Sequence, residues 1–314
     1  MIWALLAGRP VNSSAMNTVR IASSDLLSTF YEQAKALGEI LVAEGIADEV
    51  EVLVTTGSVM NAEMVACGDA DLGFMASNWV PRAVAGTPPF AVPVAVAIAA
   101  PLNAGPLFFV AKADSEVESV AQLRGRKVAV GHRDSGMAQH ALNMVRAFGW
   151  GEDGMDFVFI STFDGGAALA TGAVDAQLQA PIPSTHFTEL CQRTSIKVVP
   201  YADGQIETAC QEVPFYTRAT VPSEFVPGQD ANIPAIGVLN VIVTACEGEP
   251  AFTGNMVSAY INRAGELEQV NPLFRGLEDL LAKAKREGIH ALAPDGAPLH
   301  PASASTFRAA GLLS

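Results

Sequence analysis

The sequence predicts an α/β protein with a two-lobed fold, in which each lobe is a mostly parallel sheet flanked by helices and a ligand cleft lies between the lobes. The main observation is a repeat: a helical stretch, a Gly-x-x-Asp turn and an apolar strand occur around residues 68–71 and again around residues 172–175. A glycine-containing loop precedes each helical stretch, with Gly57 in the first copy and Gly165 in the second. This order of strands and helices is typical of parallel sheets covered on both faces.

The elements of the first lobe follow from hydrophobic periodicity. Phe30, Ala34, Leu37 and Leu41 share one face of a helix. β-Branched residues then indicate a strand before the first glycine loop. The expected elements are a strand at 18–22, a helix at 26–44, a strand at 50–55, a helix at 59–67 and a strand at 72–76.

The second lobe repeats this alternation, and the chain then returns to the first lobe. The segment 90–100, interrupted by Pro93, is expected to be a buried strand or a strand and turn. The apolar strand at 236–244 is expected to cross back, and a helical tail follows it. The other expected elements are strands at 107–111, 127–130, 157–160, 176–179 and 196–200, and helices at 119–123, 137–148, 250–263, 273–287 and around 307.

These elements set the expected boundaries of the lobes. Lobe I comprises residues 1–107 and 240–314, and lobe II comprises residues 108–239. The two chain crossings place the hinge near residues 105–110 and 233–244.

The bulk composition excludes several classes of protein. The net charge of −14 argues against nucleic-acid binding, which needs clustered basic residues, and the densest basic cluster, at 283–286, is interpreted as the end of an exposed helix. No stretch is long and apolar enough to span a membrane. The four cysteines form no C-x-x-C pair, so free, buried thiols are expected and neither a metal nor a cofactor is.

The N-terminal segment leaves the compartment open. Residues 2–7 are apolar, but they are too few for a signal sequence and have no basic residues before them. The protein is expected in the periplasm if a signal peptide has been removed, and in the cytoplasm if Met1 or Met16 is the native start.

The strongest local indication of a site is the loop at 131–136, where a strand ends and a helix begins. Free N–H groups at a helix start, together with the helix dipole, favour an anion. His132 is a possible acid, base or hydrogen-bond donor, Arg133 a possible carboxylate clamp, and Ser135 a helix cap. The alternative is an ordinary capped helix with Arg133 in solvent. His140, inside the next helix, is expected at the surface.

Similar features end the strands of the first lobe, at the edge where α/β sheets bind ligands. Ser24 and Ser58 follow two of these strands, and Asn78 and Trp79 follow a third. Trp79 is expected to stack on a planar ligand while Asn78 orients it, the alternative being a partly buried tryptophan in a loop. Gln179 is their counterpart in the second lobe.

Several segments resemble one family along nearly the whole chain, from about Thr18 to Leu312. They resemble the TAXI group of solute receptors for TRAP transporters, which have the type II periplasmic binding protein fold. The segments that carry the resemblance lie at 56–61, 68–72, 123–131, 135–136, 213–216, 227–234 and 298–301.

The resemblance implies a receptor, acting as a monomer, that closes on a small carboxylate-bearing solute, an organic acid or an amino acid, and delivers it to TRAP membrane subunits. The chemistry of individual residues adds four expected ligand contacts that the resemblance does not supply: Phe30, Trp79, His132 and Arg133. The ligand contacts carried over by position from the family are Ser24, Tyr31, Ser58, Asn78, Ser135, Gly136, Met137 and Gln179.

One departure from the family keeps a second hypothesis open. Where the family has a glycine pair before its tyrosines, this chain has a bulkier, acidic loop beginning at Asp25. The alternative is a cytoplasmic, cofactor-free enzyme on the same fold, a decarboxylase or lyase acting on an aromatic or dicarboxylic acid. Its acid–base and carboxylate-holding groups would be Asp25, His132, Arg133 and Asp134.

Overall fold

The computed structural model describes residues 16–26, 28–151, 154–179, 185–213 and 215–314, and its strands form one curled, mixed sheet. The strand order is β2-β1-β3-β10-β4-β7-β5-β6, with β8 also paired to β4 and β9 to β10. The strands are β1 (Met16–Ala22), β2 (Ala47–Leu53), β3 (Leu72–Ala76), β4 (Val96–Lys112), β5 (Lys127–Ala129), β6 (Asp156–Val158), β7 (Ala176–Gln179), β8 (Ile196–Val199), β9 (Thr217–Val221) and β10 (Ile233–Ala245).

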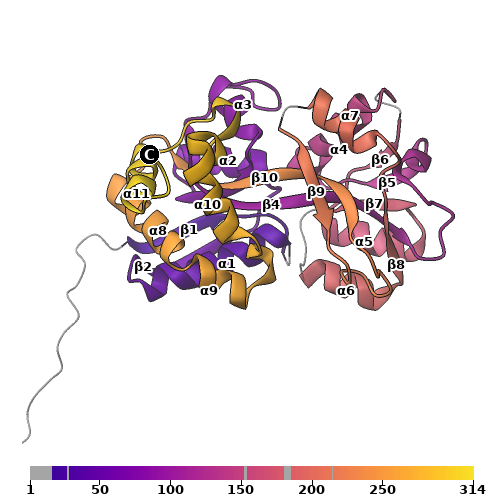
Figure 1. The fold of residues 1–314 in the computed structure, drawn as a ribbon, viewed down its shortest axis with the longest axis horizontal. Helices are drawn as coiled ribbons and strands as arrows, with labels where there is room; N and C mark the ends of the chain where they lie inside the picture. Colours follow the sequence, from indigo (N-terminus) through magenta and orange to yellow (C-terminus); the bar gives the residue numbers. More distant parts are fainter. Residues whose placement is uncertain (1–15, 27, 152–153, 180–184, 214) are drawn as a thin grey trace, which may run out of the picture.

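Helices flank this sheet on both sides of the molecule (Figure 1). None of those in the described ranges combines the length and the apolar character needed to cross a membrane. The α-helices are α1 (Thr29–Ala43), α2 (Ser58–Cys67), α3 (Trp79–Ala85), α4 (Gly136–Ala147), α5 (Thr162–Thr171), α6 (Thr185–Arg193), α7 (Gln205–Glu212), α8 (Pro250–Asn262), α9 (Ala264–Val270), α10 (Leu277–Glu287) and α11 (Pro301–Ala309). Short 3-10 helices lie at Val120–Leu123, Pro272–Phe274, Gly288–Ala291 and Pro294–Gly296.

Figure 1 shows the elements gathered into two groups joined by β4 and β10. The first group contains β1 to β3, α1 to α3 and α8 to α11, and the second contains β5 to β9 and α4 to α7. The two long strands pair antiparallel with each other and extend into both groups, where β10 pairs with β3 and β9, and β4 pairs with β7 and β8. The groups are therefore joined by hydrogen-bonded sheet.

The repeated Gly-x-x-Asp turn has the same role in both groups. Gly68 and Gly172 end α2 and α5 in the left-handed conformation, with φ of 82° and 78°. Asp71 Oδ2 then accepts the N–H of Arg20 at 2.7 Å, and Asp175 Oδ2 accepts the N–H of Lys127 at 2.9 Å. Each aspartate thus fixes the start of its own strand against the neighbouring parallel strand.

An arginine completes each turn. Arg20 lies beside Asp71, with Nε and Oδ2 3.4 Å apart, and Arg126 lies beside Asp175, with Nη1 and Oδ1 3.2 Å apart. The repeat seen in the sequence therefore corresponds to a repeated three-dimensional unit.

Several elements differ from the expectations. The single strand β4 contains residues 96–100 of the segment expected at 90–100 and all of the strand expected at 107–111, with Pro101 and Pro106 between them, whereas residues 90–95 precede it. Because prolines are unusual inside a paired strand, the sequence predicted two strands where the structure has one. The helix expected at 26–44 begins only at Thr29, after the Ser28 cap, and the helix expected at 273–287 begins at Leu277. Helices α3, α6, α7 and α9 and strand β9 were not predicted.

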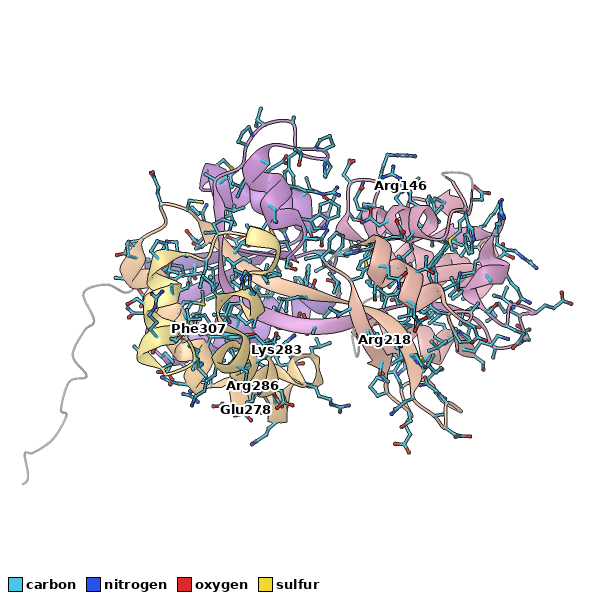
Figure 2. The ribbon with its side chains drawn as sticks, turned by 45° about the horizontal axis from the view of Figure 1, so that its top comes forward. Arg146, Arg218, Glu278, Lys283, Arg286 and Phe307 are labelled. Carbon is cyan, nitrogen blue, oxygen red and sulfur yellow. The ribbon has the colours of Figure 1, made fainter. Side chains whose placement is uncertain are left out.

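Two expectations about the surface can also be compared with the structure. The basic cluster at 283–286 lies at the C-terminal end of α10, and Figure 2 labels Lys283 and Arg286 there, both exposed. The four cysteines are free, but Cys67 is exposed and the others are half-buried, so the expectation of buried thiols was wrong. The N-terminal segment on which the compartment depends lies outside the described residues.

Candidate functional site

A cavity of about 100 Å³ lies between the two groups and is lined by residues of both. Because one water needs about 10–15 Å³, this volume suits several waters or one small organic solute. The lining residues already expected from the sequence are Ser24, Phe30, Ser58, His132, Ser135, Gly136, Met137 and Gln179. Asp25, from the enzyme hypothesis, lines the cavity as well.

The first turns of two helices from opposite groups meet at this cavity. Helix α2 begins at Ser58 after Gly57, which has φ of 105° and provides no side-chain cap. Helix α4 begins at Gly136, and its Ser135 cap accepts the N–H of Ala138 at 3.2 Å. The first N–H groups of a helix have no partner within it, so both helices direct positive dipole ends toward the cavity.

Gly136 allows the two helix starts to come close together. A Cβ at this position would lie 2.9 Å from Ser58 Oγ and 3.2 Å from Trp79 Nε1, both from the first group. Ser58 Oγ is itself held by the N–H of Ala76 at 3.3 Å. Any side chain at position 136 would therefore separate the two groups here.

Buried donors without partners surround the same place. Trp79 is fully buried and Gln179 is 3% exposed, yet Trp79 Nε1 and Gln179 Nε2 have no hydrogen-bond partner. Both side-chain atoms of buried Asn78 also lack one. Leaving a buried polar group unpaired costs about 1–3 kcal/mol, and an acceptor oxygen of a ligand would relieve this cost at Gln179, which lines the cavity.

Asp25 and His132 join the two groups at the edge of the cavity. Asp25 Oδ1 lies 3.1 Å from His132 Nε2, and Asp25 Oδ2 accepts the N–H of Thr162 at 3.2 Å. Thr162 is the first residue of α5, so the carboxylate lies at a third helix start.

His140 forms part of the inner wall and was wrongly expected at the surface. It is 2% exposed, its Nδ1 lies 2.9 Å from Tyr216 Oη, and its ring packs near Trp79 with centroids 6.3 Å apart. Desolvation by burial lowers the pKa of His140 to about 3. The imidazole is therefore neutral near pH 7 and adds polarity to the wall without charge.

The remaining wall is largely apolar. Phe30, Leu107, Met137 and Val238 line it, and Phe30 is held edge-on against Phe74 with centroids 5.8 Å apart. Asn240 adds an amide, whose Nδ2 donates to Asn103 Oδ1 at 3.3 Å. The cavity lining thus combines N–H donors with hydrocarbon side chains.

Four of the ligand contacts expected from the sequence lie outside the cavity lining: Tyr31, Asn78, Trp79 and Arg133. Trp79 is fully buried, with the Arg82 guanidinium 5.0 Å from its ring centroid, so its ring is not a stacking surface for a ligand. Arg133 is exposed and lies over Phe159 at 4.0 Å, as in the solvent-facing alternative. Asp134, from the enzyme hypothesis, is exposed and also lies outside the lining.

Other lining residues were not anticipated as ligand contacts. His140 follows Gly136 by four positions, so the helical period alone places both on one face of α4. Thr162 begins α5 as Gly136 begins α4, but its place at the cavity depends on how the two groups face each other. Gly57 and Gly131 lie in loops that were expected at the site. The unanticipated lining residues are Ser28, Thr29, Thr56, Ala76, Leu107, His140, Thr162, Val238 and Asn240.

Comparison with known proteins identifies the fold and the family. A model of the NMT1-like family matches residues 21–311. The alkanesulfonate-binding protein SsuA from Xanthomonas axonopodis pv. citri, solved with MOPS, is 14% identical, with a TM-score of 0.52 over 94% of this chain and 85% of its own. The amino acid ABC transporter substrate-binding protein AbpA from Streptococcus pneumoniae, solved with L-arginine, is 12% identical, with a TM-score of 0.50 over 82% of this chain and 95% of its own.

A histidine kinase sensor domain similar to periplasmic binding proteins gives the same picture. It is 16% identical, with a TM-score of 0.53 over 83% of this chain and 97% of its own. At these identities the likeness concerns the fold, and it confirms the prediction of an α/β fold of the periplasmic-binding-protein kind. Because the family model matches nearly the whole chain, the protein belongs to the NMT1-like family.

Proposed function

We propose that this protein is a solute-binding receptor that closes two lobes around a small organic anion. The lobes are residues 1–107 with 240–314 and residues 108–239, and the hinge lies near 105–110 and 233–244, where β4 and β10 join the two groups. One observation carries the proposal: the starts of α2 and α4 meet at the cavity beside the unpartnered Nε2 donor of Gln179. Ligand bound there contacts both lobes and therefore favours the closed state.

The chemistry of the lining favours a compact anionic group with an apolar remainder. None of the described lining residues is Lys or Arg, so helix N–H groups, Ser135 and Gln179 supply the donors. A carboxylate fits these donors, and the alkanesulfonate-binding neighbour makes a sulfonate the closest alternative for the test. Phe30, Leu107 and Val238 would contact the hydrocarbon part of the ligand.

The closed receptor would deliver its ligand to a membrane transporter. The sequence resemblance favours TRAP-type membrane subunits, and the periplasmic-binding-protein fold favours action in the periplasm. Closure would present both lobes to the transporter in one fixed arrangement, so the transporter would distinguish loaded from empty receptor.

The decisive experiment measures thermal unfolding against a panel of monocarboxylates, aliphatic sulfonates, amino acids, dicarboxylates and aromatic acids. A ligand that binds only the native protein raises its melting temperature by mass action. We expect selective stabilisation by one class of anion, and mass spectrometry should recover the stabilising compound unchanged. A panel without any stabilising anion would contradict the proposal.

One observation favours the enzyme hypothesis and is tested by the same samples. Asp25 and His132 are paired at 3.1 Å at the cavity edge, an arrangement that acid–base chemistry also uses. However, Arg133 and Asp134 of the same hypothesis lie outside the lining. Recovery of a decarboxylated or cleaved product would establish the enzyme and overturn the receptor.

A further inference from the structure

Asp25 places a carboxylate of the protein itself inside the cleft. It follows β1 in the first group, but both of its polar partners belong to the second group. One carboxylate oxygen accepts the first N–H of α5 from Thr162 at 3.2 Å, and the other lies 3.1 Å from His132 Nε2. Asp25, His132 and Thr162 all line the cavity.

This pair of contacts suits a carboxylate. Each oxygen accepts from a different donor, and one of the donors begins a helix of 10 residues, where an anion is stabilised by the dipole. An asparagine of the same shape would still accept from the Thr162 N–H, but it would turn a donor NH₂ toward His132 and would carry no charge at the helix start. The Asp25 side chain is 21% exposed, which leaves it partly shielded from water.

The loop around Asp25 is fixed by its own contacts. Ser24 Oγ and Ser28 Oγ lie 2.5 Å apart, and Ser28 caps α1 by accepting the N–H of Tyr31 at 3.3 Å. The backbone N–H of Ser28 also donates to the carbonyl of Asp25 at 3.1 Å. The backbone of this loop is therefore held by contacts within lobe I, and the carboxylate extends from it to His132 and Thr162 of lobe II.

We propose that Asp25 is a specificity-determining residue that fills the anion position at the start of α5 with its own carboxylate. The α2 and α4 starts remain for an external anion, while a second acidic group on the same ligand would meet Asp25. Within the proposed receptor function, on which this inference rests, the cavity therefore accepts ligands with one anionic group and rejects matched dicarboxylates. The same carboxylate links lobe II to lobe I through His132 and Thr162.

The first test supplies the missing carboxylate from solution and needs no knowledge of the ligand. Asp25→Ala should melt at a lower temperature than the wild type. Sodium formate should reduce this difference in melting temperature until the effect saturates, whereas sodium chloride at equal ionic strength should not reduce it. Formate bound at the α2 and α4 starts would act on both proteins alike, so the difference isolates the vacated position. The exposed Asp48 provides a matched control, because Asp48→Ala removes the same charge. The difference in melting temperature between Asp48→Ala and the wild type should not change with formate. For Asp25→Ala, a difference that stays constant at every formate concentration would overturn the proposal.

The second test uses Asp25→Asn, which keeps the side-chain volume and so preserves folding if the alanine variant fails. Titration calorimetry would compare butyrate with succinate, two probes of equal chain length that carry one and two carboxylates. The ratio of succinate to butyrate affinity should rise about tenfold in Asp25→Asn, because a like charge has been removed from a partly buried site. An unchanged ratio would refute the role of Asp25 in specificity. If neither acid binds any variant while formate rescues Asp25→Ala, the Asp25 position holds and the proposed ligand class fails.

Discussion

At the scale of single residues, the buried histidine gives the clearest consequence. Burial lowers the pKa of His140 from 6.5 to about 3, so the unfolded chain binds a proton between these values that the folded protein does not. The buried neutral imidazole therefore makes its full contribution to the free energy of unfolding above about pH 6.5. This contribution is lost progressively as the pH falls toward 3. At pH 5 the loss should be about 2 kcal/mol, since each pKa unit corresponds to about 1.4 kcal/mol.

Urea unfolding of wild type and His140→Gln between about pH 5 and pH 8 measures this contribution. The variant should be less stable at pH 8, because it disturbs the contact with Tyr216, and its stability should fall less toward pH 5. His290→Gln, at an exposed position, should follow the wild-type curve. Parallel curves for wild type and His140→Gln would contradict a buried neutral imidazole.

At the scale of elements, the two Gly-x-x-Asp turns provide an internal comparison. Asp71 and Asp175 accept equivalent strand N–H groups and pair with equivalent arginines, but their side chains are 18% and 35% exposed. Asp71→Ala should therefore lower the free energy of unfolding by about 1.5–3 kcal/mol, the range for hydrogen bonds to charged groups. Asp175→Ala should cost less, because water replaces its contacts more readily. Chemical denaturation of both variants checks the order, and a larger loss for Asp175→Ala would be the contrary result.

The same elements show what the sequence can predict. Glycines with positive φ and apolar strands mark β3, β7 and the ends of α2 and α5, so these elements were predicted at or close to their observed bounds. Helices α3, α6, α7 and α9 and strand β9 were missed, although α6 and α7 are amphipathic. They are short elements that pack against the long strands or neighbouring helices. Local signals thus identified the repeating units but not the elements that complete them.

The candidate site likewise has features that the local sequence predicts and features that it does not. The start of α4 was predicted from its loop, since Ser135 and Gly136 carry a local capping signal. The burial of Trp79 and the packing of the Arg133 guanidinium over the Phe159 ring were not predictable, because each depends on residues distant in the chain. The place of Thr162 beside Asp25, 137 positions away, likewise follows only from the folded arrangement.

At the scale of the whole molecule, Gly136 should control closure. A methyl group there would meet Ser58 Oγ at 2.9 Å, so Gly136→Ala should hold the groups apart and weaken binding of the panel's best anion at least tenfold. Small-angle scattering should show that this anion compacts the wild type but not the variant. Gly254→Ala is the matched control, since its added methyl meets Thr306 Oγ1 at only 3.6 Å within ordinary contact distance. Normal compaction of Gly136→Ala would show that this contact does not limit closure.

The two long strands also affect how tightly a small cavity can hold its ligand. Because β4 and β10 are hydrogen-bonded to each other as they pass between the groups, relative motion is confined to bending and twisting of one two-stranded ribbon. Two bodies on a loose tether would lose much orientational freedom when a ligand fixed them together, and that loss would weaken binding. Here the ribbon has already removed most of that freedom during folding. In the proposed receptor, a ligand of only a few non-hydrogen atoms would therefore bind selectively, because little of its interaction energy would be spent on aligning the two lobes.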